Sequence, residues 1–257
     1  MVAEVLLANG FETDWTDHIR LPSLRRILRC DLVYGIYLQT CSRYLLAAKL
    51  LRKKTVLHFV GSDAYWIHRE RSFWRHRYWR FVLNHVELIL YVSPHLEAFV
   101  GRKGAVLPFP ISTGSFRDAK ATQATPDRDV LYYCPSGEMN EKIYRLEWIV
   151  DYAREHLGEK ITIIGNSSHP ANYQLDLPNV EIIPCAERGQ MPALYRRHKT
   201  LIRMTTEDGL PRMVHEALLC GLKVIYNGRE ITEVPPEREP AKFASTFKQA
   251  LAQICEK

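Results

Sequence analysis

Short runs of apolar residues alternate along the chain with stretches in which apolar residues recur every three or four positions. Buried strands that alternate with amphipathic helices predict a parallel sheet with helices on both faces. In the first part of the chain, Cys41–Leu51 is a predicted helix. The predicted strands there are Ala3–Ala8, Asp31–Tyr37, Thr55–Val60 and Leu88–Val92.

A second series of strands and helices follows residues 113–129, which are rich in Ser, Thr, Ala and charge and therefore predict a linker. Its predicted strands are Val130–Cys134, Ile161–Ile164, Val180–Ile183, Thr200–Met204 and Lys223–Tyr226, and its predicted helices are Glu141–Leu157, Met191–His198 and Pro211–Cys220. An apolar stripe within 235–257 predicts a last helix that docks elsewhere, with the first domain as one option. The pattern favours an α/β protein with two Rossmann-like, doubly wound domains, 1–112 and 130–234.

The composition is that of a globular protein. The chain has 257 residues, of which 46% are hydrophobic and 25% charged, which excludes disordered, collagen-like and coiled-coil classes. The apolar runs are shorter than the ~18 residues of a membrane span, and no basic-then-apolar leader opens the sequence. Six cysteines without a CxxC pair predict buried thiols rather than disulfides or a zinc site. We expect a cytoplasmic protein.

The net charge of +6 lies entirely in the first half of the chain. Residues 1–115 hold sixteen Lys and Arg against nine Asp and Glu, whereas residues 116–257 hold nineteen against twenty. This asymmetry indicates that the first half faces something anionic. Much of the charge comes from five arginines interleaved with aromatic residues, namely Arg69, Arg71, Arg75, Arg77 and Arg80.

These arginines predict a basic amphipathic helix with Trp74, Tyr78, Phe81 and Val82 on one face. Three readings stay open: a core-packing helix with a solvated arginine face, a surface for an anionic membrane or a phosphorylated-lipid acceptor, and nucleic-acid binding. Nucleic acid is the least favoured, because the basic half contains no known nucleic-acid-binding module. If the helix binds an anionic membrane, the protein would attach to the cytoplasmic face of that membrane.

The most informative segment is TTEDGLPRMVHEALLC, residues 205–220. A glycine turn and Pro211 precede a predicted helix, so the amides of Gly209 and Leu210 would point out of its N-terminus at the carboxyl edge of a parallel sheet, which suits phosphate. Glu216 lies six residues beyond Leu210. At ~1.5 Å per residue this is about 9 Å along the helix axis, roughly the offset between the diphosphate and the ribose of one nucleotide. The alternative is that Asp208 complements the helix dipole and Glu216 pairs with Arg212.

The motif DGLPRMVHE, followed by ALLCG and VIY, resembles the acidic-seven-Glu signature of retaining glycosyltransferases with the GT-B fold, in the family 4-like group also termed glycosyl transferases group 1. Further segments resemble that family in the same order. They are CDLVYGIY, LLAAKLLRKKTVLHFVGSDAY, ELILYVSPHLEAFV and VLPFPI on the acceptor side, and VLYYCPSGEMNEK, ITIIGN and NVEIIPCAERGQMPALYRRHKTLIRMTTEDG on the donor side. The resemblance covers roughly residues 30–228.

The resemblance implies that a nucleotide-sugar, such as a UDP- or GDP-sugar, binds the C-terminal domain and an acceptor binds the N-terminal one. Glu216 would bind the ribose, Asp208 would contact the transferred sugar, and Lys142 would neutralise the leaving diphosphate in place of a metal. Other implied donor-binding residues are Gly137, Arg145, Gly165, Asn166, Cys185, Ala186, Gly209, Leu210 and Pro211. Implied acceptor-side residues are His58, Gly61, Ser62, Asp63 and Ser93. No metal site and no cofactor are expected.

The chain departs from the family pattern at several positions. Gly137 stands where an Arg is common, with Arg145 as a substitute, and Val60 stands where many relatives have His, with His58 two residues earlier. Asp208 replaces the usual Glu, and the N-terminal domain is shortened. The resemblance implies a retaining hexosyltransferase. The alternatives are a nucleotide-sugar epimerase or hydrolase on the same scaffold, and a non-catalytic nucleotide-sugar-binding subunit.

Overall fold

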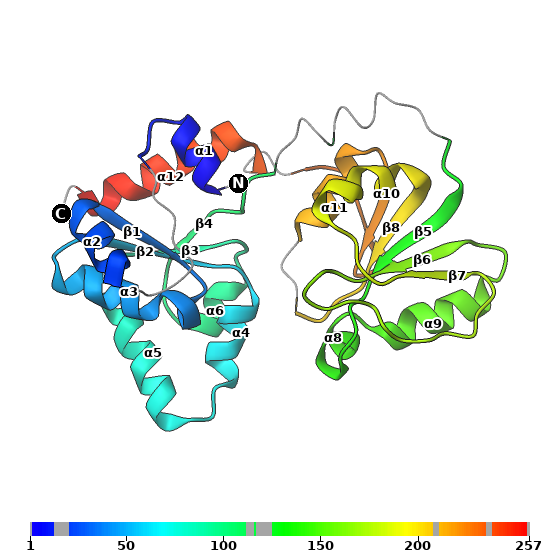
Figure 1. The fold of residues 1–257 in the computed structure, drawn as a ribbon, viewed down its shortest axis with the longest axis horizontal. Helices are drawn as coiled ribbons and strands as arrows, with labels where there is room; N and C mark the ends of the chain where they lie inside the picture. Colours follow the sequence, from blue (N-terminus) through cyan, green and yellow to red (C-terminus); the bar gives the residue numbers. More distant parts are fainter. Residues whose placement is uncertain are drawn as a thin grey trace. The chain divides into compact units, whose positions relative to one another are not determined.

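The computed structural model of the chain describes residues 2–12, 21–111, 116, 125–207, 211–234 and 238–255. The chain forms two compact units, one of Met1–Ile111 with Pro236–Lys257 and one of Ser112–Pro235. Each unit is built on a mainly parallel sheet with helices on both faces (Figure 1). The α/β class predicted from the sequence is therefore confirmed.

The first unit contains a four-stranded parallel sheet in the order β1-β2-β3-β4. Its strands are β1 (Leu32–Ile36), β2 (Lys54–Phe59), β3 (Leu88–Tyr91) and β4 (Ala105–Val106). One face packs against the helices that connect the strands, where Leu45, Trp79 and Leu96 join one core. The helices of this unit are α1 (Val2–Ala8), α2 (Leu21–Arg29), α3 (Leu38–Leu50), α4 (Ser62–Arg69), α5 (Phe73–His85), α6 (Leu96–Val100) and α12 (Pro240–Cys255).

Helices α1 and α12 cover the other face of this sheet (Figure 1). The prediction of a strand at Ala3–Ala8 is wrong, because this segment is the helix α1. Val5 and Leu6 are buried in one core with Phe243 and Phe247 of α12. Helix-favouring Ala, Glu and Leu, together with apolar residues at helical spacing, explain why the segment docks as a helix.

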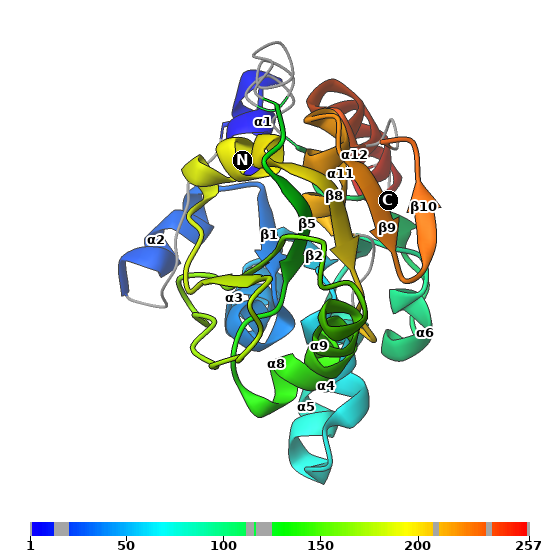
Figure 2. The same ribbon diagram turned by 90° about the vertical axis from the view of Figure 1, so that its right-hand side faces the viewer.

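The second unit contains a six-stranded sheet in the order β10-β9-β8-β5-β6-β7. The part from β10 to β5 is labelled in Figure 2. The chain runs from β5 outward to β7 on one side, and then returns to place β8 and β9 on the other side of β5. The strands are β5 (Arg128–Tyr133), β6 (Ile161–Ile164), β7 (Val180–Ile183), β8 (His198–Arg203), β9 (Lys223–Tyr226) and the antiparallel β10 (Arg229–Ile231). The helices are α8 (Glu138–Ile143), α9 (Leu146–Glu155), η1 (Arg188–Gln190), α10 (Met191–Arg197) and α11 (Arg212–Leu219).

The predicted continuous helix Glu141–Leu157 is wrong, because α8 and α9 are separated at Tyr144 and Arg145. Arg145 has a left-handed backbone with φ of 48°. The hydroxyl of Tyr132, on β5, donates to the Tyr144 carbonyl at 2.7 Å and to the Arg145 carbonyl at 3.3 Å. These bonds hold carbonyls at the helix break, so a contact from a distant strand accompanies the interruption.

Two expectations from composition concern the cysteines and the membrane. Cys30, Cys41, Cys134, Cys185 and Cys220 are free thiols, and three of them are buried. Within the part of the chain that the structure describes, no helix is both long and apolar enough to span a bilayer.

Candidate functional site

The donor-side residues that the structure describes lie mainly in the loops that follow the parallel strands of the second sheet. Gly137 comes after β5, Gly165 and Asn166 after β6, and Cys185 and Ala186 after β7. Because the carboxyl ends of parallel strands meet at one edge, the fold places these loops along the same edge of the sheet. Asp208, Gly209 and Leu210, predicted in the loop after β8, lie outside the described residues.

The strand order reverses between β5 and β8, which are neighbours in the sheet. At such a switch point the loops on either side diverge, and α/β proteins bind ligands there. The backbone N–H of Thr206, after β8, donates to the carbonyl of Ile143 at 3.0 Å. The loop that leads toward Asp208 is thus joined to the end of α8.

A buried arginine, which the sequence analysis missed, lies at this switch point. Arg203 is the last residue of β8 and is 4% exposed. Its guanidinium carbon lies 4.5 Å from the ring centroids of both Tyr133 and Tyr144. A cation in contact with aromatic rings is stabilised, more so when it is removed from water. The only signal in the sequence is one basic residue inside the apolar strand TLIRM.

Glu216 lies on α11 and is 7% exposed. The hydroxyl of Tyr195, on α10, donates to its Oε2 at 3.3 Å. Burial, and then the nearby Glu216 carboxylate, hold the pKa of Tyr195 well above its ordinary value. Pro211 is the N-cap of α11 rather than part of its first turn. The helix therefore carries a carboxylate into the interior of the second unit.

Lys142 lies on α8, and its side chain is exposed. Its ammonium donates to Glu138 Oε1 at 2.7 Å, and this carboxylate raises the pKa of Lys142. Gly137 is the N-cap of α8 with φ of 115°, and its N–H donates to Glu141 Oε1 at 3.0 Å. In this structure the predicted diphosphate lysine is engaged in an intrahelical ion pair.

Gly165 and Asn166 shape the loop after β6. A Cβ on Gly165 would lie 2.3 Å from the Ala171 nitrogen and 2.4 Å from the Pro184 oxygen, so only glycine fits there. The Asn166 amide donates to the Tyr133 hydroxyl. The N–H of Ala186 donates to the Gly165 carbonyl at 3.3 Å. These contacts tie the end of β5 to the loops after β6 and β7.

Among the acceptor-side residues, Gly61, Ser62 and Asp63 form the start of α4, after β2. Asp63 is fully buried, and its Oδ1 accepts hydrogen bonds from the N–H groups of Val60, Gly61 and Ala64 at 3.0–3.1 Å. Burial raises the pKa of the Asp63 carboxyl. Asp63 thus fixes the turn that leads into α4, and Ser62 is exposed beside it.

Ser93 follows β3 and shares a hydrogen bond of 2.9 Å with His95 Nδ1. The other ring nitrogen of His95 lies 3.2 Å from the Tyr65 hydroxyl of α4. Ser93 is half-buried and His95 is exposed. The loops after β2 and β3 are therefore linked by a polar chain at the carboxyl edge of the first sheet.

His58 does not lie at a surface where an acceptor would reach it. Its ring is fully buried, with Nδ1 2.5 Å from the Tyr34 hydroxyl and its centroid 4.6 Å from that of Phe109. Burial lowers the pKa of His58 to about 3, so the ring is neutral. The prediction of an acceptor-side role for His58 is corrected to one in the core, because the face of β2 that carries it is covered.

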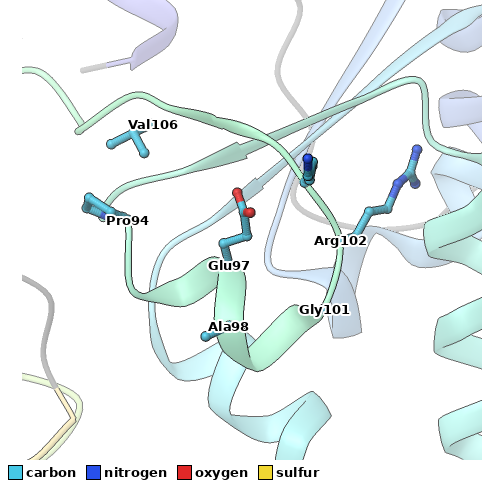
Figure 3. Close-up of a pocket in the computed structure, with 7 residues that line it drawn as sticks. Pro94, Glu97, Ala98, Gly101, Arg102 and Val106 are labelled. Atoms are coloured by element: carbon cyan, nitrogen blue, oxygen red, sulfur yellow. The ribbon is translucent and has the colours of Figure 1, made fainter.

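A pocket of about 510 Å³ opens on the first unit beside α6 and β4 (Figure 3). Glu97, Arg102 and Val106 are among the residues that line it, and Pro94 borders it next to Ser93. It contains none of the predicted site residues. Within the described ranges, no group of three or more His, Cys, Asp or Glu side chains is placed to hold a metal ion.

The fold is that of GT-B proteins, which consist of two Rossmann-like units. No family model matches the sequence, and no curated protein sequence matches it significantly. Among solved structures, sucrose-phosphate synthase from Thermosynechococcus elongatus is similar with a TM-score of 0.59 at 15% identity, covering 98% of this chain and 82% of that one.

Two further structures are similar over most of the chain. HepE from Anabaena, in complex with UDP, has a TM-score of 0.57 at 11% identity and covers 91% of this chain and 72% of its own. A UDP-forming α,α-trehalose-phosphate synthase from Burkholderia vietnamiensis has a TM-score of 0.57 at 10% identity, with 91% and 73% covered. At these identities the likeness establishes the fold.

Proposed function

We propose that the chain is a glycosyltransferase that moves a hexose from a nucleoside diphosphate to an acceptor, with retention of configuration and without a metal ion. The observation that carries the proposal is the switch point of the second sheet, where the loop after β8 is joined to the end of α8 and Arg203 is buried. Similar structures of HepE in complex with UDP and with UDP-glucose support a UDP-sugar as the donor.

In this proposal the donor lies along the carboxyl edge of the second sheet. Glu216 accepts hydrogen bonds from the ribose hydroxyls, and the amides of Gly209 and Leu210 bind the diphosphate. Arg203 supplies a fixed positive charge close to that edge, which stabilises the negative charge that develops on the leaving diphosphate. Lys142 exchanges its exposed pair with Glu138, a weak interaction, for a phosphate oxygen.

The reaction breaks the bond between the sugar C1 and the diphosphate oxygen, and forms a bond between C1 and an acceptor hydroxyl oxygen on the same face. The departing diphosphate oxygen takes the proton of that hydroxyl. Asp208 contacts the transferred sugar, and Ser62 and Ser93 offer hydroxyls on the acceptor side.

Thermal unfolding with UDP, GDP, ADP and their glucose conjugates tests the donor site. A nucleotide at about 100 times its Kd adds about 2.7 kcal/mol to the free energy of unfolding. We expect UDP and UDP-glucose to stabilise the chain most. The absence of stabilisation by every nucleotide would overturn the proposal.

Replacing Asp208 with Asn separates the transferase from its alternatives. A transferase loses sugar transfer but keeps nucleotide stabilisation, whereas a binding subunit keeps its biological activity. An epimerase would change the sugar in the absence of any acceptor, which product analysis by NMR detects. The same spectra give the anomeric configuration, and activity unchanged by EDTA is the expectation for a metal-independent enzyme.

A further inference from the structure

Helix α5 has a buried face and an exposed face that is also aromatic. Trp79, Val82 and Leu83 are buried in the core of the first unit. On the outer side, Trp74 is 77% exposed and Phe81 is 52% exposed. The single apolar face predicted from the sequence is therefore corrected, since Trp74, Tyr78 and Phe81 lie outside and only Val82 lies inside.

The outer side of α5 and the turn before it also carry most of the local charge. Residues 66–85 contain five arginines and one acidic residue, a net charge of +4. Arg77 lies over the Phe73 ring, with its guanidinium carbon 5.4 Å from the centroid. Arg75, whose side chain is exposed, lies 3.7 Å from the largely buried carboxylate of Glu70.

One of the five predicted arginines serves the fold instead. Arg80 donates to the carbonyl of Val100 at 3.1 Å and so fastens α5 to the end of α6. Six exposed basic and aromatic residues of this helix and its preceding turn form what we call the α5 outer face: Arg71, Phe73, Trp74, Arg75, Arg77 and Phe81.

This face is unlike an ordinary solvated helix surface. Exposed apolar side chains that occur singly need no explanation, but Trp74 and Phe81 lie seven residues apart on the same side of α5, and the Phe73 ring contacts that of Trp74 with the centroids 5.5 Å apart. Phe73 is 63% exposed, and the fold gives its ring no place in the core. In Figure 1, α4 and α5 extend away from the sheet of the first unit, so this helix pair forms a projecting edge of that unit.

The chemistry of the α5 outer face fits a lipid surface. Large aromatic rings enter the headgroup region of a bilayer, and arginines beside them bind lipid phosphates. Each basic residue near an anionic membrane surface contributes about 1 kcal/mol of binding free energy. We propose that the α5 outer face docks the protein on an anionic bilayer, with Phe73, Trp74 and Phe81 in the headgroup region and the arginines against phosphates.

Two other occupants fit the face less well. A second copy of the chain would bring the same arginines opposite one another in a symmetric interface, which like charges oppose. Single-stranded nucleic acid is held in a positively charged groove, whereas α5 is a projecting helix. Both remain as outcomes of the test, through measurement of the oligomeric state and of RNA binding.

Vesicle flotation of the whole chain tests the proposal without any donor or acceptor, so its result is independent of the proposed sugar transfer. Phosphatidylcholine vesicles are compared with vesicles that also contain about 30% phosphatidylglycerol, at about 0.1 M and 0.5 M salt. We expect binding to the anionic vesicles that weakens at high salt. Equal binding to both kinds of vesicle would overturn the proposal.

Charge variants test the arginines. The double variant Arg71→Gln, Arg77→Gln should weaken binding to anionic vesicles about 30-fold, from ~1 kcal/mol for each residue. The matched control Arg154→Gln, Lys160→Gln removes two exposed charges from the second unit. Binding by the control should equal that of the parent chain. A similar loss of vesicle binding in both double variants would show that binding depends only on net charge, and would overturn the proposal that the α5 outer face is the docking surface.

Aromatic variants test insertion. The double variant Trp74→Ala, Phe81→Ala should weaken binding about tenfold or more, because both rings leave the headgroup region. Its control, Met139→Ala with Leu157→Ala, removes two apolar side chains that are 57% and 62% exposed on the second unit. Unchanged vesicle binding by the aromatic variant, or a loss of self-association or RNA binding in its place, would refute the proposal. Thermal unfolding confirms that each variant folds.

Discussion

Replacing Glu216 with Gln probes the proposed ribose contact with the smallest change in shape. Hydrogen bonds to a charged group exceed those to a neutral group by about 1 kcal/mol. If the carboxylate accepts from two ribose hydroxyls, the variant loses about 2 kcal/mol and the Kd for UDP rises about 30-fold. Isothermal titration calorimetry with UDP at neutral pH measures this change.

The structure also predicts what the variant leaves intact. Glu216 is 7% exposed, and its Oε2 accepts from the Tyr195 hydroxyl at 3.3 Å. The amide oxygen of Gln can accept that same bond, so the free energy of unfolding should change by less than about 1 kcal/mol. Tyr195→Phe is the matched control. It removes the internal bond, should lower stability by about 1–1.5 kcal/mol, and should change UDP affinity less than threefold, roughly.

The two variants therefore separate a binding role from a structural one. A purely structural Glu216 would show a loss of stability in Glu216→Gln and an unchanged Kd for UDP in the folded protein. That pattern would refute the reasoning and leave the donor site without its ribose ligand.

Two further predictions concern stability. Gly165→Ala should lower the free energy of unfolding, measured in urea, by about 1–3 kcal/mol, because the new Cβ meets the backbones of Ala171 and Pro184. In the control Gly158→Ala the new Cβ meets no atom within 4 Å, so the free energy of unfolding should change by less than about 0.5 kcal/mol. Equal effects of the two substitutions would contradict the close packing at Gly165. The pKa of His58 is about 3 in the folded chain and 6.5 ordinarily, so the unfolded state binds the proton first and stability falls below pH 6.5. The free energy of unfolding then decreases by about 1.4 kcal/mol per pH unit, and His58→Asn should remove this decrease. If the free energy of unfolding of the variant depends on pH as steeply as that of the parent chain, His58 is accessible to protons in the folded state.

The sequence predicts several strands closely, and β6, β7 and β9 have the predicted bounds although only β6 is fully buried. The strands β3 and β6 consist of residues that are all buried, and the apolar runs predicted for them match within one residue. Such runs can be read locally because every side chain in them must leave water. The chemistry of the loops after these strands follows the same logic, since the carboxyl ends of parallel strands share an edge.

The predicted roles of the site residues depend on ligands, and they remain predictions. Gly137, Gly165, Asn166, Cys185 and Ala186 reach the expected edge of the second sheet. Their roles toward a nucleotide-sugar are tested by the binding experiments above. The same holds for Asp208 and its two neighbours, which lie outside the described residues.

The sequence alone determined the alternation of strands and helices, the division into two α/β units and the loops that carry the motifs, because these depend on periodicity within a segment. The tertiary structure alone decided that α8 ends at Ile143, that His58 is buried and that Arg203 lies against two tyrosine rings. Each of these outcomes depends on a contact between residues far apart in the chain. Local pattern carries no information about such a partner until the chain has folded.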